Sequence, residues 1–314
     1  MILERGGVRM DWITGIQKAI DYIEEHLLEE IDYKDVATQS FSSSYHFQRV
    51  FSVLCGFTLG EYIRNRRLSL AAVELAQNKA KVIEVALKYG YESPDSFSKA
   101  FQKFHGILPS VVTKGSDLKS FSRLVVKVSL EGGSTMNYRI EEKPEMILTG
   151  YKAHFSGVPF GDERKRQEEN LFVTTRAKQW LLRGARGSTS DTKTDMCVIT
   201  NIDDNGYDFY YALPLDKYER DNMYNVSVTG FEYMKEFGFE NIVIPKQTYA
   251  IFTTEEQPFP TKEYMDIRQK IISEWLPSTD WFIANAPEIS AYYWYPGEKK
   301  GKRYIEIWMP IEKR

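Results

Sequence analysis

The sequence predicts a multidomain chain: an all-α part with a double helix-turn-helix, followed by an α+β part of two βαββ repeats. A helical apolar stripe occurs once near residue 50 and again fifty positions later. Beyond about residue 136 the apolar period changes from helical to alternating, which is typical of strands. The stripe is Phe47, Val50, Phe51 and Leu54, and its copy is Phe97, Ala100, Phe101 and Phe104.

Length and composition are those of a folded soluble protein. The chain has 314 residues, of which 42% are hydrophobic and 27% are charged, so it is long enough for two ordinary domains. No apolar run approaches the roughly 20 residues of a membrane span, and the start has no apolar signal core. We expect a cytoplasmic protein with no membrane partner.

The cysteines and histidines give no sign of a disulfide or a metal site. Cys55 and Cys197 fall in distant predicted elements, and the four histidines lack the spacing of metal ligands. We therefore expect no metal, no cofactor and no catalytic residue.

The first predicted element is a scaffold helix over residues 12–28, with an apolar stripe and acidic residues on its other side. A short helix over residues 33–40, capped by Asp32, precedes the recognition helix within Ser43 to Phe57. The short helix and the recognition helix together predict a helix-turn-helix. Tyr45, Gln48 and Arg49 lie opposite the apolar stripe and can reach base edges or phosphates.

The next predicted helix joins the two copies. Thr58 and Glu61 form a capping box, and the helix runs to about Ala76, which gives a length of about 28 Å, close to one DNA turn. Arg66 on this helix is placed to meet backbone phosphate, although a solvated helix face explains it equally well. Net charge is −5 over residues 1–39 and +5 over residues 40–119, so positive charge gathers where the DNA-facing helices are predicted.

The second unit repeats the first. A helix over residues 81–89 is followed by Gly90 as the turn, and Ser93 with Pro94 begins the second recognition helix. Ser98 and Lys99 face outward from its apolar stripe. Two such faces at one repeat distance predict binding to double-stranded DNA over two major-groove turns.

The runs YHFQRVFSVLCGFTLGEYIRNRRLSLAAVEL and IEVALKYGYESPDSFSKAFQKFHGILPS resemble the DNA-binding region of AraC/XylS-type transcription factors. The resemblance implies two helix-turn-helix units on one chain that reads an asymmetric site. We also expect an activator with RNA polymerase as a further partner, although the sequence leaves the sign of regulation open. The resemblance also matches Tyr45, Gln48, Arg49, Ser98 and Lys99 to base-contacting positions. At the first turn the chain has Ser40 and Phe41, where many relatives have glycine.

We expect the DNA-binding domain over residues 1–115, a linker over 116–135 and the second domain over 136–314. The linker contains two glycine- and serine-rich segments around a possible short strand. The second domain is predicted to contain the same order of elements twice. The first copy has two strands, a helix over 163–182 and two further strands, and the helix of the second copy is over 261–276. The two halves are expected side by side with a groove between them.

The second domain holds 29 of the 44 aromatic residues, which suggests a lined pocket. In the last strand, alternation places Tyr304, Glu306 and Trp308 on one face. A carboxylate between aromatic rings suits an organic cation, whereas the plain alternative is an exposed glutamate on an edge strand. The further candidate ligand residues are Tyr292, Trp294 and Tyr211.

The segments around MILTGYKA and YIEIWMPIEK resemble the GyrI-like effector-binding domain. This resemblance implies a small-molecule groove with an acidic residue near its centre, and Glu306 takes the matching position. The leading interpretation is a transcription regulator that senses an amphipathic, cationic or aromatic effector. The alternatives are a hydrolase of reactive small molecules, using Glu306 with Tyr304, and a protein-binding module.

Overall fold

The computed structural model describes residues 12–78, 80–126, 135–186, 193–225, 236–294 and 302–313. The chain forms two compact units that divide in the sequence near residue 132. Within the described ranges, no helix is both long and apolar enough to cross a membrane.

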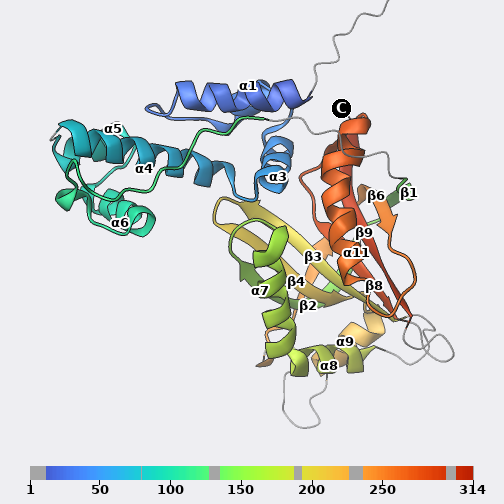
Figure 1. Cartoon of the computed structure of the whole chain (residues 1–314). Helices are drawn as coiled ribbons and strands as arrows, with labels where there is room; N and C mark the ends of the chain where they lie inside the picture. Colours follow the sequence, from blue (N-terminus) through green and yellow to red (C-terminus); the bar gives the residue numbers. More distant parts are fainter. Residues whose placement is uncertain are drawn as a thin grey trace, which may run out of the picture. The chain divides into compact units, whose positions relative to one another are not determined.

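The described part of the amino-terminal unit consists of helices and connecting loops, as the sequence predicts (Figure 1). Helices α2 and α3 form one helix-turn-helix, α5 and α6 form the other, and α4 joins them. The connecting helix has 20 residues, close to its predicted length. The bounds are α1 Trp12–Glu25, α2 Tyr33–Thr38, α3 Ser44–Cys55, α4 Leu59–Asn78, α5 Val82–Lys88 and α6 Pro94–His105, followed by a 3-10 turn at Pro109–Val111.

The predicted caps are confirmed. Thr58 and Glu61 bond reciprocally at the start of α4: Glu61 N donates to Thr58 Oγ1 at 3.1 Å, and Thr58 N donates to Glu61 Oε2 at 2.8 Å. At the start of α6, Ser93 Oγ accepts a hydrogen bond from Ser96 N at 3.2 Å, and Pro94 is the first helical residue. Phe97 and Phe101 are buried in the hydrophobic core of the second helix-turn-helix.

The two helix-turn-helix turns use different residues in the same backbone region. Gly90 lies between α5 and α6 with a φ of 79°, and Phe41 lies between α2 and α3 with a φ of 53°. Glycine takes a positive φ freely, but phenylalanine rarely does. The ring of Phe41 is 67% exposed and gains little burial there. We infer that this turn keeps the glycine geometry at a cost of about 1 to 2 kcal/mol.

Residues 121–126 of the predicted linker pack on the helical unit and form no strand. Phe121 N donates to Ser69 Oγ at 2.8 Å, and Leu124 N donates to Tyr62 Oη at 3.2 Å. The ring of Phe121 also meets those of Phe57 and Tyr62. Backbone and side-chain contacts thus join this segment to the amino-terminal unit. Residues 127–134, which contain the rest of the predicted strand, lie outside the described residues.

The carboxy-terminal unit is an antiparallel sheet with helices, as the sequence predicts (Figure 1). The helix predicted over residues 163–182 is split at Thr175 into two. The strands are β1 Tyr138–Lys143, β2 Met146–Phe155, β3 Lys193–Asp203, β4 Gly206–Leu213, β5 Glu240–Ile244, β6 Gln247–Thr253, β7 Trp281–Ile283, β8 Glu288–Trp294 and β9 Arg303–Lys313. The helices are α7 Gly161–Thr174, α8 Arg176–Ala185, α9 Lys217–Asn225 and α11 Thr261–Lys270, which continues through a π turn at Ile271–Trp275 and a 3-10 turn at Leu276–Ser278.

The two repeats exchange their first strands. The sheet order is β1-β6-β9-β8-β3-β4-β2-β5, with β7 added beside β9. The βαββ core of the first repeat is β2, its helices, β3 and β4, and that of the second repeat is β6, α11, β8 and β9. Strand β1 pairs with β6 of the second repeat, and β5 pairs with β2 of the first. The halves are therefore joined at β3 and β8 and also interlocked at both edges.

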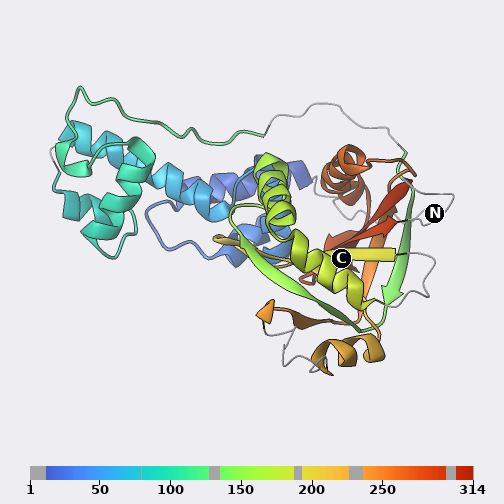
Figure 2. The same cartoon turned by 90° about the horizontal axis from the view of Figure 1, so that it is seen from below.

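Both faces of the sheet are buried. Along β4, Phe209 and Tyr211 belong to an aromatic core under α7 and α8, whereas Tyr210 and Ala212 belong to a second core on the other face. This second core draws residues from β5 at one end of the sheet through to β6, next to the other end, and the sheet curves around it (Figure 2). Helices α7 and α11 lie on the same face of the sheet (Figures 1 and 2).

Candidate functional site

The predicted DNA-facing residues differ in their exposure. Lys99 on α6 is exposed, and Ser98 beside it is partly buried. On α3, Tyr45 and Gln48 are partly buried, and Gln48 Nε2 donates to Ser44 Oγ at 3.1 Å. Arg49 is only 3% exposed, although the helical period placed it on the outward face.

Arg66 does not reach outward for phosphate, which corrects the prediction. Its Nε and Nη2 donate to the two carboxylate oxygens of Glu24 at 2.8 and 2.7 Å, and its Nη1 donates to Phe121 O at 2.6 Å. The side chains of Arg66 and Glu24 are 13% and 10% exposed. This guanidinium joins α1, α4 and the segment after α6, so its role is structural.

Burial and hydrogen bonding shift the pKa of Glu24 in opposite directions. Burial alone would raise the pKa of this carboxyl, but the hydrogen bonds from Arg66 and Tyr62 outweigh it and lower the pKa. Tyr62 Oη donates to Glu24 Oε1 at 2.6 Å. The pair is therefore ionised and well satisfied inside the unit.

The predicted cation site around Glu306 is filled by cations of this chain. Alternation along β9 is correct, because Trp308 Nε1 donates to Glu306 Oε2 at 2.9 Å and so lies on the same face. However, Arg139 of β1 donates to Glu306 Oε1 at 2.7 Å, and Lys143 Nζ lies 4.7 Å from the centre of the Trp308 ring. Arg139 and Lys143 thus engage the charge of Glu306 and the face of Trp308, and ligand binding by these two residues stays a prediction.

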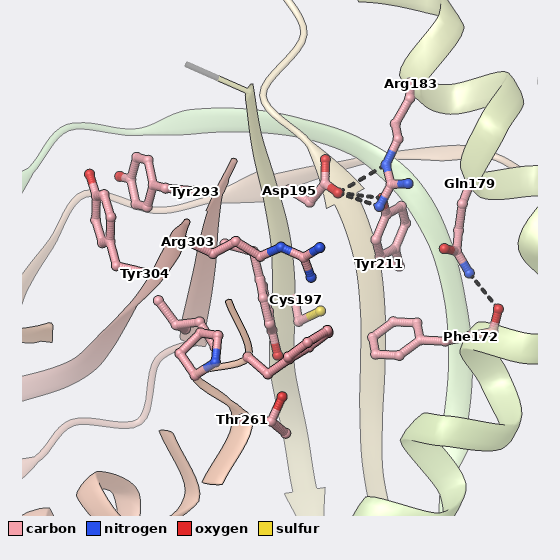
Figure 3. Close-up of a pocket in the computed structure, with 14 residues that line it drawn as sticks. Phe172, Gln179, Arg183, Asp195, Cys197, Tyr211, Thr261, Tyr293, Arg303 and Tyr304 are labelled. Carbon is pink, nitrogen blue, oxygen red and sulfur yellow. Dashed lines mark hydrogen bonds and ion pairs between the residues drawn. The ribbon is translucent and has the colours of Figure 1, made fainter. Parts of the chain in front are cut away.

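A cavity of about 250 Å³ lies beside this sheet and is lined from both of its faces (Figure 3): Tyr211 belongs to the helix-covered face, whereas Tyr293, whose Oη donates to Glu306 Oε2 at 3.0 Å, belongs to the face of Glu306. Its wall comes from β3, β4, β8 and β9, from α7 and α8, and from the start of α11. Three of the six predicted ligand residues line it, namely Tyr211, Tyr292 and Tyr304. The side chain of Trp294 lies outside the described residues. Further lining residues, absent from the prediction, are Phe172, Arg183, Asp195, Phe259, Tyr293 and Arg303.

The acid of the cavity is Asp195 on β3, and it is fully paired. Arg183 donates to Asp195 Oδ2 through Nε at 3.0 Å and Nη2 at 2.6 Å, and Tyr211 Oη donates to the same oxygen at 2.9 Å. Arg186 Nη2 lies 3.4 Å from Asp195 Oδ1. The carboxylate is 2% exposed, and Figure 3 shows it bonded to Arg183 at one side of the cavity.

Arg303 at the start of β9 brings a second positive charge to the cavity. Its guanidinium carbon lies 5.5 Å from the centre of the Phe259 ring. Burial, and after it the positive charge of Arg183, lowers the pKa of Arg303. Figure 3 shows the guanidinium of Arg303 between Tyr293 and Tyr304 on one side and Asp195 with Arg183 on the other.

Two family models match the chain. A model described as a helix-turn-helix domain matches residues 36–115, and a model described as an integron-associated effector binding protein matches residues 139–311. The HTH-type transcriptional activator AarP of Providencia stuartii is 42% identical over 96 residues, which are 31% of this chain and 71% of AarP. The transcriptional regulator Rob of Salmonella typhimurium is 32% identical over 112 residues, which are 36% of this chain and 39% of Rob.

The chain is an AraC-type transcription regulator. Its carboxy-terminal unit is a GyrI-like effector-binding domain. A crystal structure of a putative transcription regulation protein from Staphylococcus aureus covers 57% of this chain and 99% of its own, with 15% identity and a TM-score of 0.38.

The effector-binding domain of this AraC-type regulator also contains a buried charged cluster between α7 and α11. Arg164 of α7 and Arg268 of α11 each donate to Pro159 O at 3.0 Å, and both are almost wholly buried. Arg268 Nε donates to Glu288 Oε1 at 2.8 Å, and Arg164 Nη2 donates to Tyr264 Oη at 2.7 Å. The cluster ties the helix of one repeat to the helix of the other next to the cavity, since the rings of Tyr264 and Tyr292 are 6.1 Å apart.

Sequence reasoning missed the charged lining of the cavity for a clear reason. Arg183 and Asp195 stand on either side of residues 187–192, and Arg303 lies at the start of the last strand, so nothing in their spacing joins them. The available signal was an acid directly before a largely apolar run in a strand, since MCVIT follows Asp195 directly. A buried acid needs partners, and basic residues on the preceding helix are the nearest candidates.

Proposed function

We propose that this AraC-type regulator binds its effector in the cavity lined by Tyr211, Tyr292 and Tyr304. The observation that carries the proposal is the cavity itself, a hollow of about 250 Å³ with aromatic walls and the charged side chains of Arg183, Asp195 and Arg303, inside the domain that matches an effector-binding family. It borders the buried cluster that ties α7 to α11. A ligand that moves either helix would therefore change the packing of both repeats.

We further propose that α3 and α6 read DNA through Tyr45, Gln48, Ser98 and Lys99. Support comes from the two helix-turn-helix units and from α4, whose 20 residues give about 30 Å between them, close to one DNA turn. One chain would then read an asymmetric duplex of about 20 base pairs. Arg49 joins this base-reading set only in a conformation that exposes its guanidinium.

The regulator is proposed to activate transcription through RNA polymerase, in the cytoplasm, without catalysing a reaction. AarP, a relative, is named a transcriptional activator. Burial raises the pKa of Cys55 to about 12 and raises that of Cys197 well above its usual range, which disfavours the thiolate form that nucleophilic catalysis needs. For the domains we propose DNA binding up to residue 126 and effector binding over residues 135–313.

Transcription from a template that carries the operator tests the proposal, using purified polymerase with and without an effector. We expect transcript to rise with the full-length protein and the response to effector to be lost in Thr261→Trp, which places an indole at the mouth of the cavity. Thr261 is exposed and lines the cavity, so the change should leave the fold intact. An undiminished effector response in Thr261→Trp would contradict the cavity as the binding site.

A further inference from the structure

We infer that the cavity selects an aromatic ligand with an anionic group, such as a carboxylate, which sits between Arg303 and Arg183. This inference rests on the proposed effector cavity and adds the charge of its ligand. It departs from the organic cation that the sequence suggests.

The first step is the charge of the lining. Among the described residues that line the cavity, Arg183 and Arg303 are positive and Asp195 is negative. Asp195 is 2% exposed and already accepts hydrogen bonds from Arg183 and Tyr211. A ligand ammonium would have to displace these donors to reach the carboxylate, which costs the contacts it replaces.

The second step concerns the aromatic faces. A cation binds over the face of an aromatic ring, but guanidinium groups of this chain are already there. The guanidinium carbon of Arg183 lies 5.8 Å from the centre of the Tyr211 ring, and that of Arg303 lies 5.5 Å from the centre of the Phe259 ring. A second cation beside them would meet repulsion, whereas a neutral aromatic body can stack against the remaining rings.

The third step is the repulsion between the two guanidinium groups. Burial, and after it the nearby charge of Arg183, lowers the pKa of Arg303, so the charge of Arg183 disfavours that of Arg303. An anion placed between them removes this repulsion and forms charge-assisted hydrogen bonds with planar donors that suit a carboxylate. The amino end of α11, at Pro260 and Thr261, lines the same cavity and adds a positive partial charge.

Three probes of one shape and different charge test the inference: 1-naphthoate, 1-naphthylmethanol and 1-naphthylmethylammonium. Each is titrated into the full chain by calorimetry. We expect naphthoate to bind about tenfold or more tightly than the ammonium, with the alcohol in between. Arg303→Gln should lower naphthoate affinity by about tenfold and leave the alcohol nearly unchanged, whereas Arg303→Lys should keep most of the preference.

Two control variants separate the possible failures. Arg166→Gln removes a guanidinium that is 72% exposed on α7, outside the cavity, and should change none of the affinities. Thr261→Trp should weaken all three probes, because it narrows the cavity. Suppose that Thr261→Trp abolishes binding of the probes, but that the wild type binds the ammonium as tightly as naphthoate. The cavity is then supported as the binding site, and the preference for an anionic ligand is wrong. If Thr261→Trp leaves every affinity unchanged, or no probe binds the wild type, the cavity itself is wrong as the effector site.

Discussion

Replacing Arg66 by alanine should destabilise the DNA-binding unit without changing how DNA affinity depends on salt. The variant loses two hydrogen bonds to Glu24 and one to Phe121 O, and it leaves the Glu24 carboxylate buried with Tyr62 as its remaining donor. Breaking a buried ion pair by removing one partner costs about 3 to 5 kcal/mol. Because the two side chains keep slight exposure, we expect about 3 kcal/mol, or on the order of a hundredfold in the opening equilibrium.

Amide hydrogen exchange of α1 and α4 measures this loss separately from the carboxy-terminal unit. Arg64→Ala is the matched control on the same helix, because Arg64 is 49% exposed and its nitrogen lies 4.0 Å from Glu61, so its loss should cost about 0.5 kcal/mol or less. The slope of log Kd against log salt should be the same in wild type and Arg66→Ala. A slope lowered by about 1, with exchange unchanged, would mean that Arg66 contacts phosphate and would refute the structural role.

The pH dependence of the same variant has a definite sign. In the wild type the pKa of Glu24 lies below its ordinary value of 4.5, so the ion pair contributes stability above pH 4.5 and loses it as the pH falls through the lowered pKa. In Arg66→Ala, the guanidinium no longer offsets the effect of burial on the pKa of Glu24. Protonation of Glu24 at low pH then removes an unfavourable buried charge. The difference in stability between the two proteins should therefore shrink as the pH falls below about 4.5, and a difference that grows would contradict this assignment.

Other expected outcomes follow from the remaining contacts. Glu306→Gln should leave the affinity for cationic and neutral aromatic ligands unchanged in calorimetry, because Arg139 occupies this carboxylate; a selective loss for cations would restore the original prediction. Lys99→Ala should weaken binding to the operator by about 1 to 3 kcal/mol and relax preference at one base pair, measured by gel-shift competition; equal losses on random DNA would contradict base reading. Arg268→Met should destabilise the carboxy-terminal unit by about 3 to 5 kcal/mol in urea unfolding, and adding Glu288→Met should recover much of the loss; no recovery would show that the pair is not the cause.

The helical unit could be predicted closely because its signals are local. The cap at Ser93, the capping box at Thr58 and the spacing of Phe97 and Phe101 each act within one or two helical turns, and the structure has all of them. The role of Arg66 could not be predicted, since its partner Glu24 lies on a different helix, far away in the sequence.

The alternation of the last strand was also correct, but it does not say which face of a sheet carries the cavity. Trp308 shares a face with Glu306, yet that face closes into a core because the sheet curves around it. The cavity is lined by residues of both faces, next to α7, α8 and the start of α11, and Arg139 comes from a strand that pairs with β6 only through the exchange of edges. Tertiary partners of this kind leave no period in the sequence.

The exchange of edge strands has a consequence for the order in which the chain is made. Tyr138 pairs with Phe252 and Leu148 pairs with Ile242, so each edge pairing closes a loop of about 100 residues, whereas the helical unit is built largely from short-range contacts. Because β9 lies between β6 and β8, the sheet cannot close until residues 303–313 have left the ribosome. A nascent chain that stops before residue 303 would have a folded DNA-binding unit but no closed sheet. Such a chain could bind DNA but could not respond to an effector.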